Sequence, residues 1–360
     1  MNNKIDNTDI AIGVENYRER KESKVRMTCT LGEMVNRVST EPKVPMLYSA
    51  IKEGSVGLVY GVAKTGKTIF CENLGMSIAA GRNKYLGKPI NTSNNKVLFV
   101  SFEEFYSGRT NRNITQLKAF SEDEKKKVKT NFFVVTENAP KVLSSKEDWS
   151  FLRSAIKENN PGIVFLDSLT RIVEGQIENS DTAKTAMLAI REIADEYKIT
   201  ICLIHHSTKM DDEKAMTQQN VAGSRVISQE TDFIIGINRT RDNVRYIKLV
   251  SARYADDNVN SVATFELDDN LWIRITGVAK EQDLLFPKLD RRKDNSNFDL
   301  LLSTMKAAID EDGFVSTSDI KKTLVTDKII SEKAMHELLG KALDLNILSN
   351  PSRGKYTFVK

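Results

Sequence analysis

A run of eight residues early in the chain has the composition of a phosphate-binding loop. It is Gly61-Val-Ala-Lys-Thr-Gly66-Lys67-Thr68, with four residues between two glycines and a lysine and a hydroxyl residue directly after. Glycines adopt backbone conformations that other residues resist, so successive N–H groups can converge on a phosphate. Lys67 would neutralise phosphate oxygens and the Thr68 hydroxyl would hold Mg²⁺. The predicted nucleotide-binding residues are Gly61, Val62, Ala63, Lys64, Thr65, Gly66, Lys67, Thr68 and Ile69.

Carboxylates follow two apolar runs that have the pattern of buried strands. Asp167 follows Ile163–Leu166, and Glu103 and Glu104 follow Val97–Phe102. Ligand sites of α/β proteins lie at the carboxyl ends of strands. We therefore predict that Asp167 holds the metal together with Thr68. Either glutamate could act as the base for an attacking water, but alternation lets only one face the nucleotide, and we favour Glu103. The alternative is a pair of solvated loop carboxylates.

Two of the three histidines, His205 and His206, follow the apolar run Thr200–Ile204. A histidine directly after a buried strand can reach a γ-phosphate. We favour His206 for this role. His336, inside a predicted helix, is expected to serve packing or the surface.

The elements that must position these residues alternate between short β-rich runs and longer amphipathic helices, from about Leu31 to Thr276. That alternation predicts a mostly parallel sheet covered by helices on both faces. Later runs are closely spaced and joined by Asn/Asp turns, which predicts antiparallel strands added at one edge. The predicted strands are Val56–Tyr60, Val97–Phe102, Phe132–Val135, Ile163–Leu166, Thr200–Ile204, Asp232–Ile237, Val244–Ala252, Ala263–Asp268 and Leu271–Thr276. The predicted helices in this part include Lys67–Ala80, Lys146–Glu158 and Thr182–Lys198.

The chain divides by composition into four parts. Residues 1–28 are polar and predicted to be a flexible arm, 29–277 form the α/β domain, and 278–297 form a linker. Residues 298–360 are predicted to be a small domain of helix, short strand, helix, helix and β-hairpin, which is the order of a winged helix-turn-helix. In such a domain Glu332–Leu345 would be the recognition helix, with Arg353 and Lys355 on the wing. Basic and acidic residues are balanced there, so protein docking is an alternative use.

Overall composition bounds the class of protein. The net charge of +4 and pI ≈ 8.7 are compatible with nucleic acid but do not imply it. No run approaches the roughly 20 consecutive apolar residues of a membrane span. Cys29, Cys71 and Cys202 are scattered, unlike a zinc site or a disulfide framework. A cytoplasmic protein without membrane contact is expected.

Taken together, the motifs resemble the RecA-like ATPases of the RepA-type plasmid replicative helicases and their mobile-element relatives. The resemblance covers about residues 45–253. It rests on the phosphate loop, Phe102-Glu103-Glu104, Phe165-Leu-Asp167-Ser-Leu-Thr-Arg171 with Glu178-Asn-Ser-Asp181, His205-His206-Ser-Thr-Lys209 and Gly223-Ser-Arg-Val-Ile-Ser-Gln-Glu-Thr-Asp232. No Asn-Lys-x-Asp for guanine follows the phosphate loop, so ATP with Mg²⁺ is favoured over GTP.

The resemblance implies a homo-oligomeric ring, usually a hexamer, with ATP at each subunit boundary and single-stranded DNA in the channel. It implies that Lys67 and Thr68 bind phosphate and Mg²⁺, Asp167 orders the metal, Glu103 activates water and His206 senses the γ-phosphate. An arginine of the neighbouring subunit would complete each site. The candidate is Arg253, although Ser251 replaces the lysine that related ATPases carry nearby, so Arg225 and Arg241 stay open.

Two functions follow as expectations. The first is an ATP-driven DNA helicase or motor that serves replication of a plasmid, phage or mobile element. The second is a nucleotide-switched DNA-binding, loading or regulatory protein with slow ATPase activity. The segment Met210–Asn220 lies where related rings carry a channel loop, and we expect it to be mobile.

Overall fold

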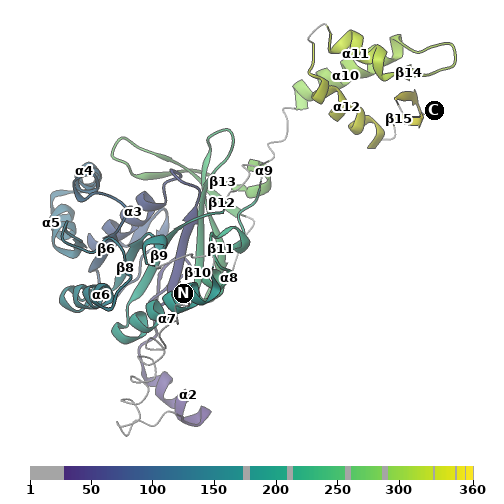
Figure 1. The fold of residues 1–360 in the computed structure, drawn as a ribbon. Helices are drawn as coiled ribbons and strands as arrows, with labels where there is room; N and C mark the ends of the chain where they lie inside the picture. The colour runs from purple at the N-terminus through teal and green to yellow at the C-terminus, as the bar shows by residue number, and fades with distance from the viewer. Residues whose placement is uncertain are drawn as a thin grey trace, which may run out of the picture.

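The computed structural model (Figure 1) describes residues 28–172, 179–208, 214–255, 261–285, 291–326, 329–344, 347–352 and 354–359. Most of the predicted flexible arm therefore lies outside the described residues. So do Glu178, Lys209 and Arg353, and residues 210–213 of the predicted channel loop.

A nine-stranded sheet forms the centre of the larger unit (Figure 1), in the order β13-β12-β11-β10-β3-β9-β8-β6-β7. The strands from β10 to β7 in this order pair in parallel, and β11, β12 and β13 add antiparallel pairs at one edge. The parallel strands are β3 (Val56–Gly61), β6 (Val97–Ser101), β7 (Phe132–Val134), β8 (Ile163–Asp167), β9 (Thr200–His206) and β10 (Phe233–Arg239). The antiparallel strands are β11 (Arg245–Ala252), β12 (Ser261–Leu267) and β13 (Ile273–Lys280). The predicted mostly parallel sheet with antiparallel edge strands is confirmed.

Helices cover both faces of this sheet, because side chains alternate along each buried strand. In β8, for example, Ile163 and Phe165 join one core cluster, whereas Val164 and Leu166 join the other. The first cluster receives side chains from α3 (Lys67–Ala79) and α5 (Glu122–Asn131), the second from α6 (Lys146–Asn159) and α7 (Ser180–Tyr197). Further helices are α4 (Tyr106–Leu117) and the short α8 (Arg225–Gln229), and two small hairpins pair β1 (Met46–Tyr48) with β2 (Ile51–Lys52) and β4 (Lys84–Tyr85) with β5 (Lys88–Pro89).

The predicted linker 278–297 is too long. β13 continues to Lys280, because Ala279 and Lys280 still pair with Val262 and Ser261 of β12. α9 (Glu281–Leu285) follows at once, and α10 (Arg291–Ala307) begins after residues 286–290, which lie outside the described part. The boundary predicted at 277 therefore comes too early.

The C-terminal unit has a hydrophobic core of its own, which includes Leu301, Met305, Ile320 and Leu339. After α10 come β14 (Val315–Ser316), α11 (Thr317–Leu324), α12 (Glu332–Asp344), β15 (Leu348–Ser352) and β16 (Lys355–Phe358). The strands form a sheet in the order β14-β16-β15. This is the predicted order of helix, strand, helix, helix and hairpin.

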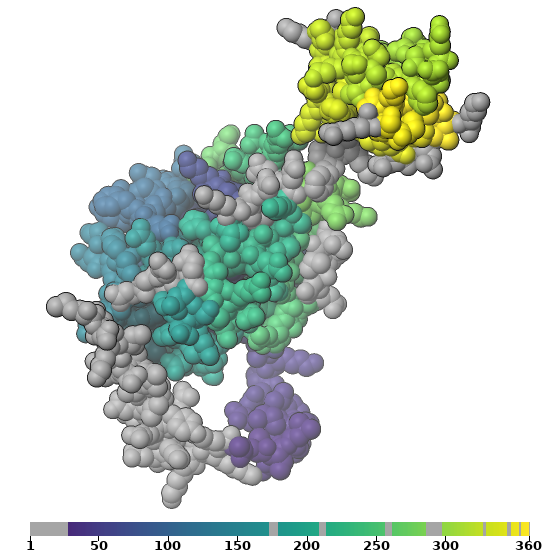
Figure 2. Space-filling view, turned by 45° about the vertical axis from the view of Figure 1, so that its right-hand side comes forward, coloured from purple at the N-terminus to yellow at the C-terminus, as the bar shows by residue number. Residues whose placement is uncertain are grey.

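Near the start of the described chain, α2 (Leu31–Thr40) begins with a capping box between Thr30 and Glu33 and buries none of its residues. Figure 2 shows it in purple. It belongs to the stretch predicted as α/β domain, yet it contributes nothing to either core cluster. Among the described helices, none is long and apolar enough to cross a membrane.

Candidate nucleotide-binding site

The phosphate loop connects the end of β3 to the start of α3. Gly61 has a φ of 157°, and a Cβ built on it would lie 1.8 Å from the carbonyl oxygen of Ile237 in β10. Gly66 caps α3 in the left-handed region, with a φ of 110°. Between them, the buried Thr65 donates from Oγ1 to the carbonyls of Val62 (2.9 Å) and Ile237 (3.1 Å). Glycine is therefore required at both ends of the loop, and Thr65 fixes the loop against β10.

Lys67 lies buried over this loop. Its Nζ donates to the carbonyl oxygens of Gly61 (3.0 Å) and Val62 (2.9 Å). Burial lowers the pKa of Lys67, while the carboxylates of Asp167 and Glu103 act in the opposite direction. An ammonium group held this way can exchange carbonyl partners for phosphate oxygens, which carry full charge.

Thr68 and Asp167 meet beside Lys67. Thr68 donates from Oγ1 to Oδ2 of Asp167 over 2.8 Å. Asp167, at the end of β8, is only 8% exposed, and its burial raises its pKa to about 6. A hydroxyl and a carboxylate are hard oxygen ligands of the kind that Mg²⁺ prefers. These two residues therefore fit a magnesium ion.

Glu103 lies on the same edge of the sheet, after β6. Its Oε1 accepts hydrogen bonds from the Ser168 hydroxyl and from the Thr170 hydroxyl (3.2 Å), and lies 3.9 Å from Nε2 of His206. His206 foremost, then the Ser168 and Thr170 hydroxyls, outweigh burial and hold the pKa of Glu103 at about 2. Glu103 is therefore an ionised carboxylate that can accept a proton from water.

Glu104 has a different environment. Its two carboxylate oxygens accept from Nη1 and Nη2 of Arg112, each over 2.6 Å. The sequence left both glutamates open as catalytic residues, and the geometry separates them. Glu103 joins the phosphate-loop residues, whereas Glu104 is held by Arg112 on α4.

The two histidines also separate. His205 is fully buried, with Nε2 2.8 Å from the carbonyl oxygen of Ala222, and burial lowers its pKa to about 4. His206 is partly exposed and lies beside Glu103. Of the two histidines, His206 is the one beside Glu103, and its role as the γ-phosphate sensor stays a prediction.

Arg253 lies on the side of the sheet where the parallel strands begin, opposite the side that carries the phosphate loop. Ala252 pairs with Phe233 at the start of β10, so Arg253 lies near the point where β3 begins rather than where it ends. Its Nη1 donates to Oδ1 of Asp232 over 2.7 Å, and its side chain is 54% exposed. Arg225 is exposed at the start of α8, and Arg241 lies in the turn after β10, at the edge that carries the phosphate loop.

The sequence profile of a family described as an AAA domain matches residues 27–212, just over half of the 360-residue chain. The chain belongs to this AAA-domain family. The matched residues contain the phosphate loop, Glu103, Asp167 and both histidines. Together with the sheet order, this makes the protein a P-loop ATPase with a RecA-like fold, and membership of such a family implies use of a nucleotide and usually Mg²⁺.

Comparisons with solved structures and with curated proteins say less about the family of this chain. The structure is similar to the crystal structure of a KaiC-like protein from the hyperthermophilic archaeon Pyrococcus horikoshii, with 17% sequence identity and a TM-score of 0.47. That similarity covers 65% of this chain and 100% of the other. No curated protein matches the sequence.

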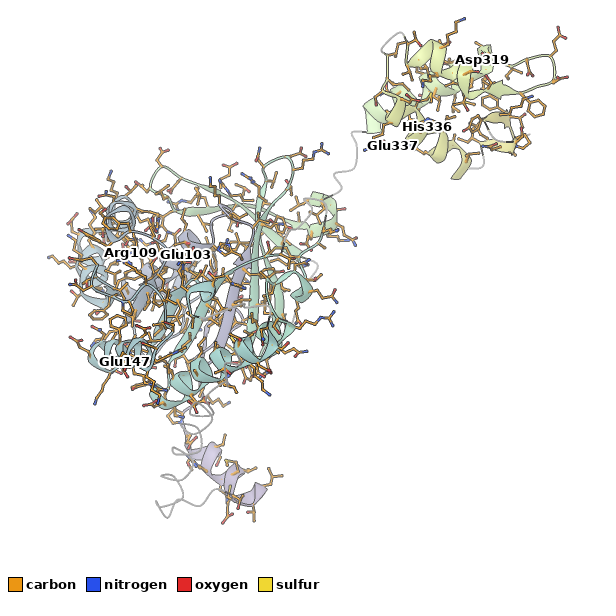
Figure 3. The ribbon with its side chains drawn as sticks, in the orientation of Figure 1. Glu103, Arg109, Glu147, Asp319, His336 and Glu337 are labelled. Carbon is orange, nitrogen blue, oxygen red and sulfur yellow. The ribbon has the colours of Figure 1, made fainter. Side chains whose placement is uncertain are left out.

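Sequence reasoning missed two residues of this AAA-domain site, Glu72 and Arg112. Glu72 is fully buried in α3 and pairs with Arg112 of α4 over 2.7 Å. A signal was present, because a glutamate among the apolar residues of the predicted helix Lys67–Ala80 is rarely buried without a partner. Figure 3 labels Glu103 and, on α4, Arg109, whose Nη2 donates to the carbonyl oxygen of Val135 over 2.7 Å.

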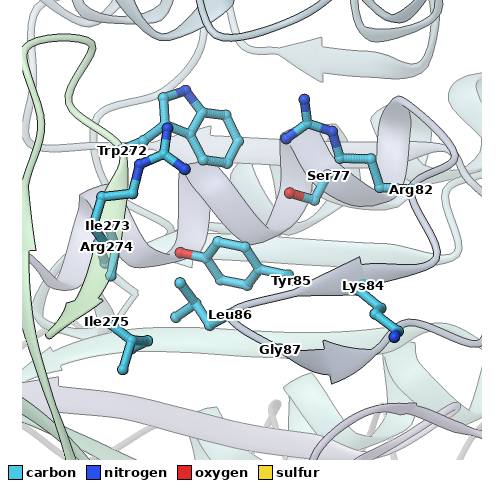
Figure 4. A pocket seen from close by; sticks show the side chains of 10 residues that line it. All are labelled: Ser77, Arg82, Lys84, Tyr85, Leu86, Gly87, Trp272, Ile273, Arg274 and Ile275. Atoms are coloured by element: carbon cyan, nitrogen blue, oxygen red, sulfur yellow. The ribbon is translucent and has the colours of Figure 1, made fainter. Parts of the chain in front are cut away.

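A cavity of about 490 Å³ lies at the other end of α3 (Figure 4). Its walls come from the end of α3, from the β4–β5 hairpin and from the start of β13. It is lined by Ser77, Arg82, Lys84, Tyr85, Leu86, Gly87, Trp272, Ile273, Arg274 and Ile275. This lining contains no phosphate-loop residue, so the cavity is distinct from the nucleotide site.

Proposed function

We propose that this AAA-domain protein hydrolyses ATP and uses the energy to act on nucleic acid, as a DNA helicase or motor in replication of a plasmid, phage or mobile element. One observation carries the ATPase part of the proposal. Lys67, Thr68, Asp167, Glu103 and His206 come from different parts of the chain and meet where β3, β6, β8 and β9 end.

The roles follow from the chemistry of each group. Water attacks the γ-phosphorus and gives its proton to Glu103, while the bond between the γ-phosphorus and its bridging oxygen breaks and ADP leaves. Lys67 neutralises charge on the phosphate oxygens. Thr68 and Asp167 would hold Mg²⁺, which supplies charge neutralisation when bound. His206 lies beside Glu103, so it would respond to loss of the γ-phosphate.

The proposal includes a homo-oligomer, most simply a hexameric ring, with each site completed by an arginine of the next subunit. Arg253 remains the candidate. Its exposed side chain and its position away from its own phosphate loop are compatible with a residue that acts in a neighbouring subunit. Arg225 and Arg241 remain the alternatives.

For nucleic acid, support comes from the C-terminal unit. Its order of elements and its three-stranded sheet support a winged helix-turn-helix, with α12 as recognition helix and the exposed Lys355 on the wing. The same unit favours the second candidate, a nucleotide-switched DNA-binding or loading protein, because its separate core would let it bind a duplex site without a motor.

The test is ATP turnover with and without single-stranded DNA, beside strand displacement on a forked duplex. Stimulated turnover with displacement supports the motor, and site-specific duplex binding without displacement supports the switch. Lys67→Ala should lower turnover at least about 100-fold, because the loop loses its cation. The matched control is Lys126→Ala, an exposed lysine of α5. Normal turnover of Lys67→Ala would reject the assignment of the loop.

A further inference from the structure

α4 presents a polar side to the protein interior. Gln116 is fully buried and Arg109 is 2% exposed, and Arg112 and Asn113 lie between them at helical spacing on the same side. An inward side of this composition costs free energy unless each polar group has a partner. Glu72 of α3, which is fully buried, accepts from Arg112, Asn113 and Gln116. Arg109 donates instead to the carbonyl oxygen of Val135.

Arg112 binds two carboxylates at once. Its Nε and Nη2 donate to Glu72 over 2.7 Å each, and its Nη1 and Nη2 donate to Glu104 over 2.6 Å each. Gln116 (3.0 Å) and Asn113 (3.2 Å) donate to the remaining positions of Glu72. A planar guanidinium that forms two forked pairs fixes direction as well as distance, which a lysine cannot do.

The two carboxylates belong to the two halves of the nucleotide site. Glu72 lies one helical turn after Thr68 on α3, the helix that follows the phosphate loop. Glu104 directly follows Glu103, in the turn between β6 and α4. The guanidinium of Arg112 therefore joins the phosphate-loop helix to the turn that carries the proposed base.

We propose that Arg112 is a positioning residue for ATP hydrolysis. By holding Glu104 against Glu72, it fixes the turn so that Glu103 stays beside Ser168 and His206. The positioning role of Arg112 rests on the proposed function only where ATP turnover is the measurement. In this proposal Arg112 contacts neither water nor nucleotide. Glu104 is the residue through which Arg112 holds the turn, and it does not act as a second base.

Two variants release the turn by different routes. Glu104→Gln removes the charge on the turn and leaves the pair of Arg112 with Glu72. The double variant Arg112→Met with Glu72→Gln removes the relay and both charges of this ion pair, and the amide oxygen still accepts from Asn113 or Gln116. The matched control is Arg82→Met with Glu124→Gln, an ion pair of 2.7 Å between the end of α3 and α5 that does not contact the turn.

The first measurement is hydrogen exchange of the peptide 101–108. We expect faster exchange, by about tenfold or more, in both released variants and wild-type exchange in the control. Because this readout needs no turnover, it tests the relay even if the wild type fails to hydrolyse ATP, a failure that would reject only the proposed function. Unchanged exchange in the released variants overturns the relay.

The second measurement is steady-state turnover with binding of a fluorescent ATP analogue. We expect kcat to fall about 10- to 100-fold with nucleotide affinity unchanged within about twofold, because the phosphate loop is intact. Combining Glu104→Gln with the double variant should lower kcat no further, since both release the same turn. Control-like kcat in the released variants, or additive losses, would show that Arg112 does not act through Glu104.

Discussion

His205 and His206 are neighbours in the sequence but have opposite environments at the end of β9. Strand alternation directs His205 into the core, where its Nδ1 has no hydrogen-bond partner among the described residues, and directs His206 toward Glu103. Glu103 and Glu104 separate in the same way, one beside Ser168 and the other on Arg112. At this scale, function depends on which of two adjacent side chains faces the phosphate loop.

His205 makes stability depend on pH. Burial lowers its pKa to about 4 from 6.5, so between these values the unfolded chain binds a proton that the folded chain does not. Stability is therefore lost as pH falls from about 6.5 to about 4, by about 2–3 kcal/mol from this residue. Denaturant unfolding of the wild type and His205→Gln should differ in pH dependence by that amount. His336→Gln, at an exposed position, is the control, and equal pH profiles for all three proteins would contradict the prediction.

Single residues were predictable wherever a motif specifies them. The phosphate loop and the carboxylate at the end of β8 follow from spacing and from the strand pattern alone. Arg112 was not predictable, because its role depends on a contact with Glu72, 40 residues away along the chain. The partner of Arg253 was hidden for the same reason: Asp232 lies at the start of another strand.

Among the elements, the described part of the predicted channel loop, residues 214–220, differs from the expected mobile segment. It is anchored at Met216, which is fully buried. The Met216 N–H donates to Glu281 over 2.8 Å, and its carbonyl accepts from Nζ of Lys248 over 2.7 Å. Lys248 and Glu281 form a buried ion pair with each other. The sequence could not predict this anchor, because β11 and α9 supply the two charges from separate elements.

This anchor predicts a difference between single and double variants. Glu281→Ala leaves the ammonium of Lys248 buried without its partner and should cost about 3–5 kcal/mol of unfolding free energy. The double variant Lys248→Met with Glu281→Gln removes both charges, and the amide oxygen at position 281 can still accept from the Met216 N–H. This variant should therefore lose less unfolding free energy. Denaturant unfolding measures both. Equal losses in the two proteins would mean that the buried charge is not what matters.

α4 illustrates why some elements escape sequence reading. Helix prediction looks for apolar residues at helical spacing, but the inward positions of α4 are polar, and its exposed positions include the apolar Tyr106 and Ile114. The distribution of polar and apolar residues on α4 is therefore nearly the reverse of that on an ordinary amphipathic helix. By contrast α6 and α7 have apolar inward faces. The predicted bounds of α3, α6 and α7 agree with the structure to within about two residues.

At the scale of the whole molecule, the hydrophobic cores are separate. The two clusters of the larger unit draw only on residues up to 285, and the third draws only on residues from 298 onward. Composition predicts a division into two units, and β13 extends past the boundary predicted at 277. A strand at the edge of a sheet, such as β13, is polar enough to resemble a linker, and only its pairing with β12 identifies it.

These separate cores predict where the chain can be cut. Removing residues 286–360 should leave nucleotide affinity unchanged within about twofold and thermal unfolding within about 3 °C. The reason is that, among the described residues, the two hydrophobic clusters of the larger unit contain none beyond 285. A cut only five residues earlier, after Lys280, also removes Glu281 and leaves the buried ammonium group of Lys248 without its charged partner. The protein that ends at Lys280 should therefore unfold far more readily. Calorimetry and analogue binding on both truncated proteins compare the two cuts. If the longer protein unfolds as readily as the shorter one, the larger unit depends on the C-terminal residues and the cores are not independent. If the longer protein is stable, it can also decide between the two proposed functions. A motor without residues 286–360 should still hydrolyse ATP faster in the presence of single-stranded DNA. A switch without these residues should no longer bind its duplex site.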